Sequence, residues 1–185
     1  MRLFASLPFP SHVQRQIADY SHSLVPAFGR AHPSWVPQEN LHLTLHFFGE
    51  LEAGTTAKLQ TLLAESAPLC PPLQLATGKL SVLPSLRAPR VLYISIEIQP
   101  VEPLAELIGR MRDIAAQIGA ETDTRPWKAH LTLARLKIFW IPEFSSLAAP
   151  PKLTFVVDSF ELMQSKLDRS GAVYSCFRRY PLAGK

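Results

Sequence analysis

The tetrapeptide His-Leu-Thr-Leu occurs twice in the chain, at residues 42–45 and 130–133. From the numbers of these residue types in the chain, about 0.006 such tetrapeptides are expected by chance. The two copies lie about half a chain length apart, which indicates an internally duplicated unit. Each copy holds two side chains capable of chemistry, a histidine and a threonine.

Strand geometry predicts what each copy presents. Residues i and i+2 of a strand share one face, so His42 lies beside Thr44 and His130 beside Thr132, while the leucines occupy the opposite faces. In a duplicated fold with two lobes, we expect the two polar faces to meet across a central cleft. Two imidazoles and two hydroxyls would then converge on one site.

This set of groups is suited to a phosphoester. The ordinary pKa of histidine, near ~6.5, lets one ring accept a proton from water while the other donates one to the leaving oxygen. Threonine hydroxyls can donate hydrogen bonds to the non-bridging phosphate oxygens, where negative charge develops in the transition state. The predicted chemistry needs no metal and no cofactor, because no carboxylate cluster or ligand triad accompanies the histidines in the sequence.

Other readings of single histidines were weighed against this one. A lone strand histidine is more often a partly buried ring with a structural hydrogen bond, so the prediction rests on the pair. A zinc site from His42 and His46 is excluded, because an i, i+4 pair meets on a helix and this segment alternates as a strand. By parity His46 either lines the cleft or lies at the surface.

The elements that position the motifs are predicted from the spacing of apolar residues. Residues 41–51 and 129–136 alternate as strands, whereas Val101 to Ile118 has helical spacing and ends before Gly119. Strands outnumber helices and are not regularly interleaved with them, which favours an α+β fold with antiparallel sheets. Further strands are predicted at 2–7, 73–83, 90–98, 153–163 and 172–182, and further helices at 55–66 and from Ser11, the predicted N-cap, to about Pro26.

Length and composition set the class of protein. A chain of 185 residues with 47% apolar and 18% charged side chains is typical of one compact domain, here residues 1–185 with two lobes. The longest apolar stretch, Val91 to Ile98, is much shorter than the roughly 20 residues of a membrane helix. Cys70 and Cys176 suit a reducing compartment. We therefore expect a cytoplasmic monomer without membrane association.

The charge is unevenly distributed along the chain. Residues 1–124 carry 9 basic and 11 acidic side chains, whereas residues 125–185 carry 10 and 4, within a net charge of +4. The last third is therefore predicted to face an anion. Its basic residues are dispersed, which argues against a flexible polybasic tail.

The sequence resembles the two-histidine phosphoesterases, and within them the bacterial and archaeal RNA 2′,3′-cyclic phosphodiesterases once called 2′-5′ RNA ligases. The likeness covers nearly the whole chain and includes both motifs with their flanks. It is carried by Arg2-Leu3-Phe4-Ala5, Asn40-Leu41-His42-Leu43-Thr44-Leu45-His46-Phe47-Phe48-Gly49-Glu50, Pro89-Arg90-Val91-Leu92-Tyr93, Arg125-Pro126-Trp127, His130-Leu131-Thr132-Leu133-Ala134-Arg135, and Ser165, Gly171 and Tyr174.

The resemblance implies a bilobal fold with pseudo-two-fold symmetry, antiparallel sheets lining a central cleft and helices outside. It also implies metal-free hydrolysis of an RNA 2′,3′-cyclic phosphate end, or of a small cyclic nucleotide, to a 2′-phosphate. By analogy His42 is the general acid, His130 is the general base, and Thr44 and Thr132 hold the phosphate.

Residues that flank the motifs are further candidates. Arg135 matches an arginine that often closes the second motif, but strand parity turns it away from His130 unless the strand twists or bulges. Arg90, Trp127 and Phe48 are candidate contacts to phosphate and base, with core packing as the alternative for the two aromatic residues.

Two other functions use the same features. A reversible ligase of 2′-5′ RNA linkages would need the same four motif residues. A non-catalytic protein that binds RNA ends would explain the basic last third and predicts salt-dependent affinity without turnover. The second is disfavoured because a binding protein has no need of two titrating imidazoles.

Overall fold

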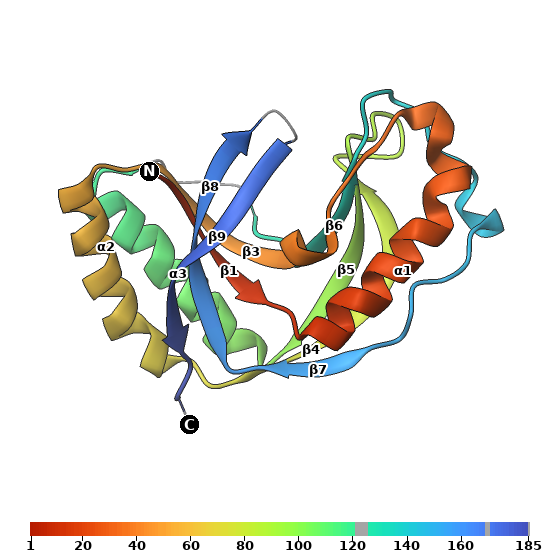
Figure 1. Ribbon diagram of the computed structural model, residues 1–185. Helices are drawn as coiled ribbons and strands as arrows, with labels where there is room; N and C mark the ends of the chain where they lie inside the picture. Colours follow the sequence, from red (N-terminus) through yellow and green to blue (C-terminus); the bar gives the residue numbers. More distant parts are fainter. Residues whose placement is uncertain (121–125, 169–170, 185) are drawn as a thin grey trace.

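The computed structural model describes residues 1–120, 126–168 and 171–184, which form two antiparallel sheets and three long helices (Figure 1). The first sheet has the strand order β3-β1-β8-β9, and the second has the order β2-β6-β5-β4-β7. Strands of the first sheet are β1 Arg2–Pro8, β3 His42–Glu50, β8 Ser159–Asp168 and β9 Gly171–Pro181. Those of the second are β2 Ser34–Trp35, β4 Leu73–Leu83, β5 Val91–Gln99, β6 His130–Arg135 and β7 Thr154–Val157.

The chain crosses between the two sheets several times. β1 and β3 come from the first third of the sequence, yet they share a sheet with β8 and β9 from its end. β1 pairs with β3 on one side and with β8 on the other. Neither sheet therefore corresponds to one continuous half of the sequence, although each sheet carries one copy of the duplicated motif.

Helices cover one side of each sheet. Figure 1 shows α2 (Ala53–Ser66) and α3 (Val101–Gln117) beside the first sheet and α1 (Ser11–Phe28) beside the second. Each helix forms because apolar residues recur at helical spacing, as Val13, Ile17 and Leu24 do on the buried side of α1. The motif leucines Leu43 and Leu131 are fully buried in the core, so the histidines lie on the opposite side of each sheet.

The α+β class with antiparallel sheets is confirmed. Most boundaries agree with the predicted elements, and Gly119 has the positive φ of 71° expected of a helix C-terminus. Ser11 is not an N-cap, because Pro10 occupies that position and α1 begins at Ser11 itself. Pro26 lies inside α1, which continues to Phe28.

Two further differences concern strands. The segment predicted as one strand at 153–163 is divided at Asp158 into β7 and the start of β8, which belong to different sheets. The two-residue strand β2 was not predicted, since its length is too short to show a period. None of the helices described by the structure is long and apolar enough to cross a membrane.

Candidate active site

Each motif strand presents its histidine and threonine on the face opposite the core. In β3, His42 and Thr44 are partly exposed and alternate with the buried Leu43 and Leu45. In β6 the same alternation holds for His130 and Thr132. The sequence-derived assignment of faces therefore agrees with the structure for all four residues.

Both motif strands bulge immediately after the threonine. In β3, Ser6 pairs with Thr44 and Ala5 with His46, so Leu45 has no partner in β1. Leu45 and His46 are consecutive buried residues, and Phe47 is 54% exposed. The extra residue thus reverses the alternation, which places Phe47 on the same face as the histidine.

The second motif carries the equivalent bulge. Leu92 pairs with Ala134 and Tyr93 with Thr132, which leaves Leu133 without a partner in β5. Leu133 and Ala134 are both fully buried, and the next residue, Arg135, is exposed. The bulge therefore returns Arg135 to the face of His130, which simple strand parity could not do.

A backbone carbonyl fixes the orientation of each imidazole. His42 Nδ1 lies 2.7 Å from the Asn40 carbonyl oxygen, and His130 Nδ1 lies 2.7 Å from the Lys128 carbonyl oxygen. Because a carbonyl oxygen only accepts, Nδ1 must be the protonated nitrogen of each neutral ring. The nitrogen that gains and loses a proton is therefore Nε2 in both histidines.

The two motifs are brought together where the sheets meet. β3 and β6 contact each other, and the Trp127 indole N–H donates a hydrogen bond of 3.1 Å to the Thr44 carbonyl oxygen. His130 is also close enough to His42 for its charge to affect the first ring. Residues 88 positions apart in the chain are thus neighbours, as the duplicated motif predicted.

His42 is enclosed by aromatic rings. Its ring centroid lies 5.1 Å from that of Phe4 and 5.4 Å from that of Tyr174, while Nε2 lies 3.0 Å from the Thr44 hydroxyl oxygen. Burial lowers the pKa of His42 below its ordinary value of 6.5, and the charge of His130 acts in the same direction. The hydrogen bond to the carbonyl of Asn40 and the negative charge of Glu161 oppose that lowering.

Glu161 is a residue that sequence reasoning missed. It lies on β8, is 7% exposed, and accepts two hydrogen bonds from Arg179, of 2.9 Å from Nε and 2.6 Å from Nη2. The neighbouring Cys176 thiol has its pKa raised, by burial first and then by this carboxylate. The alternation of Glu161 with the apolar Phe160 and Leu162 was a usable signal for its face, but it did not reveal which strands lie beside β8.

The other predicted contacts have different surroundings. Phe48 is 1% exposed in the core, so the expectation that it contacts a base is corrected, and the bulge at Leu45 is the reason. His46 is neither in a cleft nor at the surface, because it is 5% exposed and packs against Phe48. Trp127 uses its indole N–H to join the motif strands.

Arg90 lies in the loop before β5, where its guanidinium carbon is 4.7 Å from the centroid of the Phe139 ring. Contact of Arg90 or Trp127 with a substrate stays a prediction. Arg125, part of the resemblance, lies outside the described residues.

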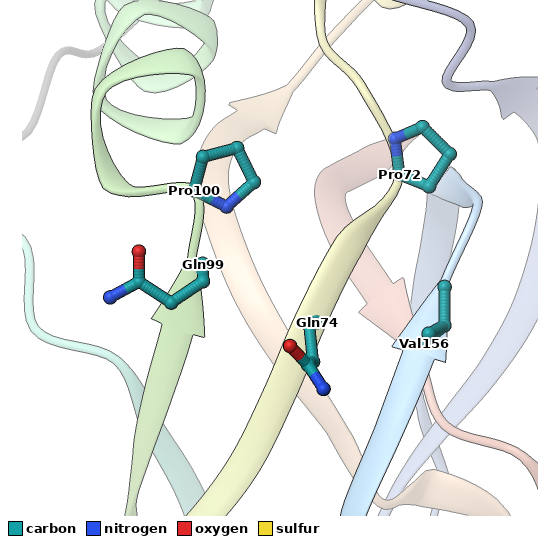
Figure 2. A pocket seen from close by; sticks show the side chains of 5 residues that line it. All are labelled: Pro72, Gln74, Gln99, Pro100 and Val156. Carbon is teal, nitrogen blue, oxygen red and sulfur yellow. The ribbon is translucent and has the colours of Figure 1, made fainter.

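Two surface hollows lie away from the motifs. Figure 2 shows one of them, lined by Pro72, Gln74, Gln99, Pro100 and Val156 from the ends of β4, β5 and β7. None of these five side chains titrates, so they cannot transfer a proton. The other hollow lies between β4 and the segment before β7 and includes Lys79, Glu97 and Lys152. Neither contains a motif residue.

No group of three or more His, Cys, Asp or Glu side chains gathers as metal ligands in the part of the chain that the structure describes.

The doubled motif on two contacting antiparallel sheets defines a two-histidine phosphoesterase. The chain belongs to the LigT-like phosphoesterase family, whose model matches residues 7–93 and 96–174. The family predicted from the sequence is therefore confirmed.

Similar proteins include an RNA 2′,3′-cyclic phosphodiesterase of Bacillus subtilis, which is 30% identical over 78% of each chain. The crystal structure of TT0787 of Thermus thermophilus superposes with a TM-score of 0.85 at 26% identity over all of both chains. Escherichia coli LigT in complex with 3′-AMP superposes with a TM-score of 0.80 at 28% identity, over 98% of this chain and 97% of that one.

Proposed function

We propose that this protein is an RNA 2′,3′-cyclic phosphodiesterase that uses His42 and His130 as its acid–base pair and needs no metal. The observation that carries the proposal is the pair of histidines on adjoining strands, each with Nδ1 held by a backbone carbonyl and Nε2 left to exchange a proton. The names of the relatives support the substrate class.

In the proposed reaction, water attacks the phosphorus of the cyclic phosphate. His130 Nε2 accepts a proton from the water as the new P–O bond forms, and the bond from phosphorus to O3′ breaks. His42 Nε2 donates its proton to O3′, which leaves a 3′-hydroxyl and a 2′-phosphate. Water supplies the second proton balance, because the base gains the proton that the acid loses.

The motif threonines and Arg135 stabilise the phosphate in this scheme. The Thr44 and Thr132 hydroxyls donate to non-bridging oxygens, where negative charge increases in the transition state. Arg135 shares the face of His130 because of the bulge at Leu133, so its positive charge adds to this stabilisation. We further propose that residues 1–185 act as one unit, with each sheet supplying one motif.

The test is hydrolysis of an oligonucleotide that ends in a 2′,3′-cyclic phosphate, with the product identified as a 2′- or 3′-phosphate. We expect a 2′-phosphate, and His42→Ala and His130→Ala should each abolish nearly all turnover while the far-UV circular dichroism is unchanged. Wild-type turnover in either variant would overturn the assignment of the pair.

Two further arms test the rest of the proposal. Activity that is lost in EDTA and restored by zinc would overturn the metal-free mechanism. Addition of a strand with a 5′-hydroxyl should leave hydrolysis as the main reaction, whereas accumulation of a joined 2′-5′ product would identify a ligase.

A further inference from the structure

A row of polar residues crosses the first sheet from the motif to its far edge. Thr44 on β3 pairs with Ser6 on β1, Ser6 pairs with Glu161 on β8, and Glu161 pairs with Arg179 on β9. Directly paired residues of neighbouring strands point to the same side of a sheet. Glu161 therefore lies on the face that carries His42 and Thr44.

The interior part of this row is buried. Ser6 is 1% exposed and Glu161 is 7% exposed, and the Ser6 hydroxyl oxygen has no hydrogen-bond partner among the described residues. A buried carboxylate is costly unless it is paired, and here Arg179 supplies the pair with two hydrogen bonds to the same oxygen. The Arg179 side chain is itself 65% exposed.

The second motif has no equivalent carboxylate. In the corresponding row of the second sheet, Thr132 pairs with Tyr93 on β5, and Tyr93 pairs with Ser81 on β4. Of the two proposed proton carriers, therefore, His42 is the one with a buried negative charge in the row beside it. The reaction scheme above uses neither Glu161 nor Arg179.

We propose that Glu161 is a positioning residue that keeps His42 able to carry a proton, and that this makes His42 the general acid and His130 the general base. The inference rests on the proposed function and adds the assignment of roles. Burial among Phe4 and Tyr174 disfavours a charged His42 ring, and a buried carboxylate on the same face offsets that effect.

Other groups that face these two residues act on the same balance. The neighbours of His42 are His130 on β6, which opposes its protonation, and Tyr174 on β9. The neighbours of Glu161 are Arg179 and Cys176 on β9, while the β1 residues beside it, Ser6 and Phe4, carry no charge. Arg179 offsets part of the Glu161 charge, so its removal should act in the opposite direction to removal of Glu161.

The first experiment is an NMR titration of the histidine rings in the free protein, which does not depend on activity. Glu161→Gln should lower the pKa of His42 by on the order of half a pH unit, whereas Glu161→Asp should retain most of the wild-type value. Arg179→Gln should raise it. Glu65→Gln, which removes an exposed carboxylate from α2, is the matched control and should change nothing.

The second experiment is the pH dependence of kcat/KM for a cyclic-phosphate oligonucleotide. A general acid must be protonated, so Glu161→Gln should move the alkaline limb to lower pH and Arg179→Gln should move it to higher pH. Movement of the acidic limb instead would overturn the assignment of His42 as the acid.

Unchanged His42 titration in Glu161→Gln would overturn the inference outright. If Glu161→Gln does not fold, the exposed Arg179→Gln variant provides the same test with the opposite sign. If the wild-type protein did not hydrolyse the oligonucleotide, the proposed function would fail, and the titration would still test the link between Glu161 and His42.

Discussion

The two motif strands are alike in backbone and different in surroundings. Both bulge at the leucine after the threonine, and both hold the histidine Nδ1 through a carbonyl two residues earlier. The hydrogen bond of His42 is partly buried beside Phe4 and Tyr174, whereas that of His130 is exposed. An identical tetrapeptide thus places its imidazole in two different electrostatic environments.

The residue after each bulge continues this contrast. The exposed position is Phe47 in the first motif and Arg135 in the second. One strand offers an aromatic face and the other a positive charge at equivalent places. The duplication therefore preserves the proton-transferring groups, while the flanks have become suited to different parts of a ligand.

The largest expected effect tests whether the two histidines act as one unit. His42→Ala and His130→Ala should each reduce kcat by roughly 10³-fold. The double variant should be about as impaired as the worse single variant, because one proton transfer without the other does not complete the reaction. Single-turnover assays measure all three. Losses that multiply in the double variant would show that the two motifs act independently.

A smaller effect should separate the two positions after the bulges. Arg135→Ala should lower kcat/KM by roughly 100-fold, since one fewer positive group stabilises the transition state, and added salt should reduce the difference. Phe47→Ala should chiefly raise KM, by about tenfold, because one stacking surface for a base is removed. Steady-state kinetics at two salt concentrations distinguish the cases. Equal changes in KM and kcat for both variants would contradict different roles.

The hydrogen bond that joins the motif strands predicts a change in stability. Trp127→Phe keeps an aromatic ring but removes the donor to the Thr44 carbonyl oxygen, which should lower the free energy of unfolding by about 1 kcal/mol. Urea denaturation measures this. Trp140→Phe, whose ring lies beside Arg30 on the second lobe, is the control for loss of an indole. An equal kcat/KM in Trp127→Phe and the wild type would show that the bond does not align the motifs.

The smallest expected effect is a pH dependence of stability that comes from His42 alone. Its pKa is lower in the folded protein than in the unfolded chain, so the unfolded chain takes up a proton first as the pH falls. The free energy of unfolding should therefore decrease below about pH 6.5, toward the folded pKa. Urea denaturation at pH 7.5 and 5.5 should show a larger decrease for the wild type than for His42→Gln. The reverse order would contradict the lowered pKa.

Local geometry explains what could be predicted from the sequence. Alternation in the motifs is a property of the strand itself, so the faces of His42 and Thr44 needed no knowledge of neighbouring strands. The bulge at Leu45 depends on pairing with β1, which begins about forty residues earlier. For that reason the faces of His46 and Phe48 were wrongly predicted, and the face of Arg135 could only be stated as a condition.

Glu161 illustrates a second limit. It belongs to a segment that was correctly predicted to be extended, but the sequence does not tell which strand lies beside β8. Its relation to His42 arises through β1, which separates the two strands. Such a carboxylate is recognisable only when the strand order is known, because no sequence spacing relates it to either motif.

The interleaved strand order also affects how the protein is made on the ribosome. β1 is synthesised first, yet one of its two edges stays unpaired until β8 has been synthesised, near the end of the chain. The first sheet must therefore close by a contact between distant parts of the sequence, which is a slow kind of step in folding. A nascent chain that has already produced both motifs still lacks β8 and β9, and with them half of the sheet that supports His42.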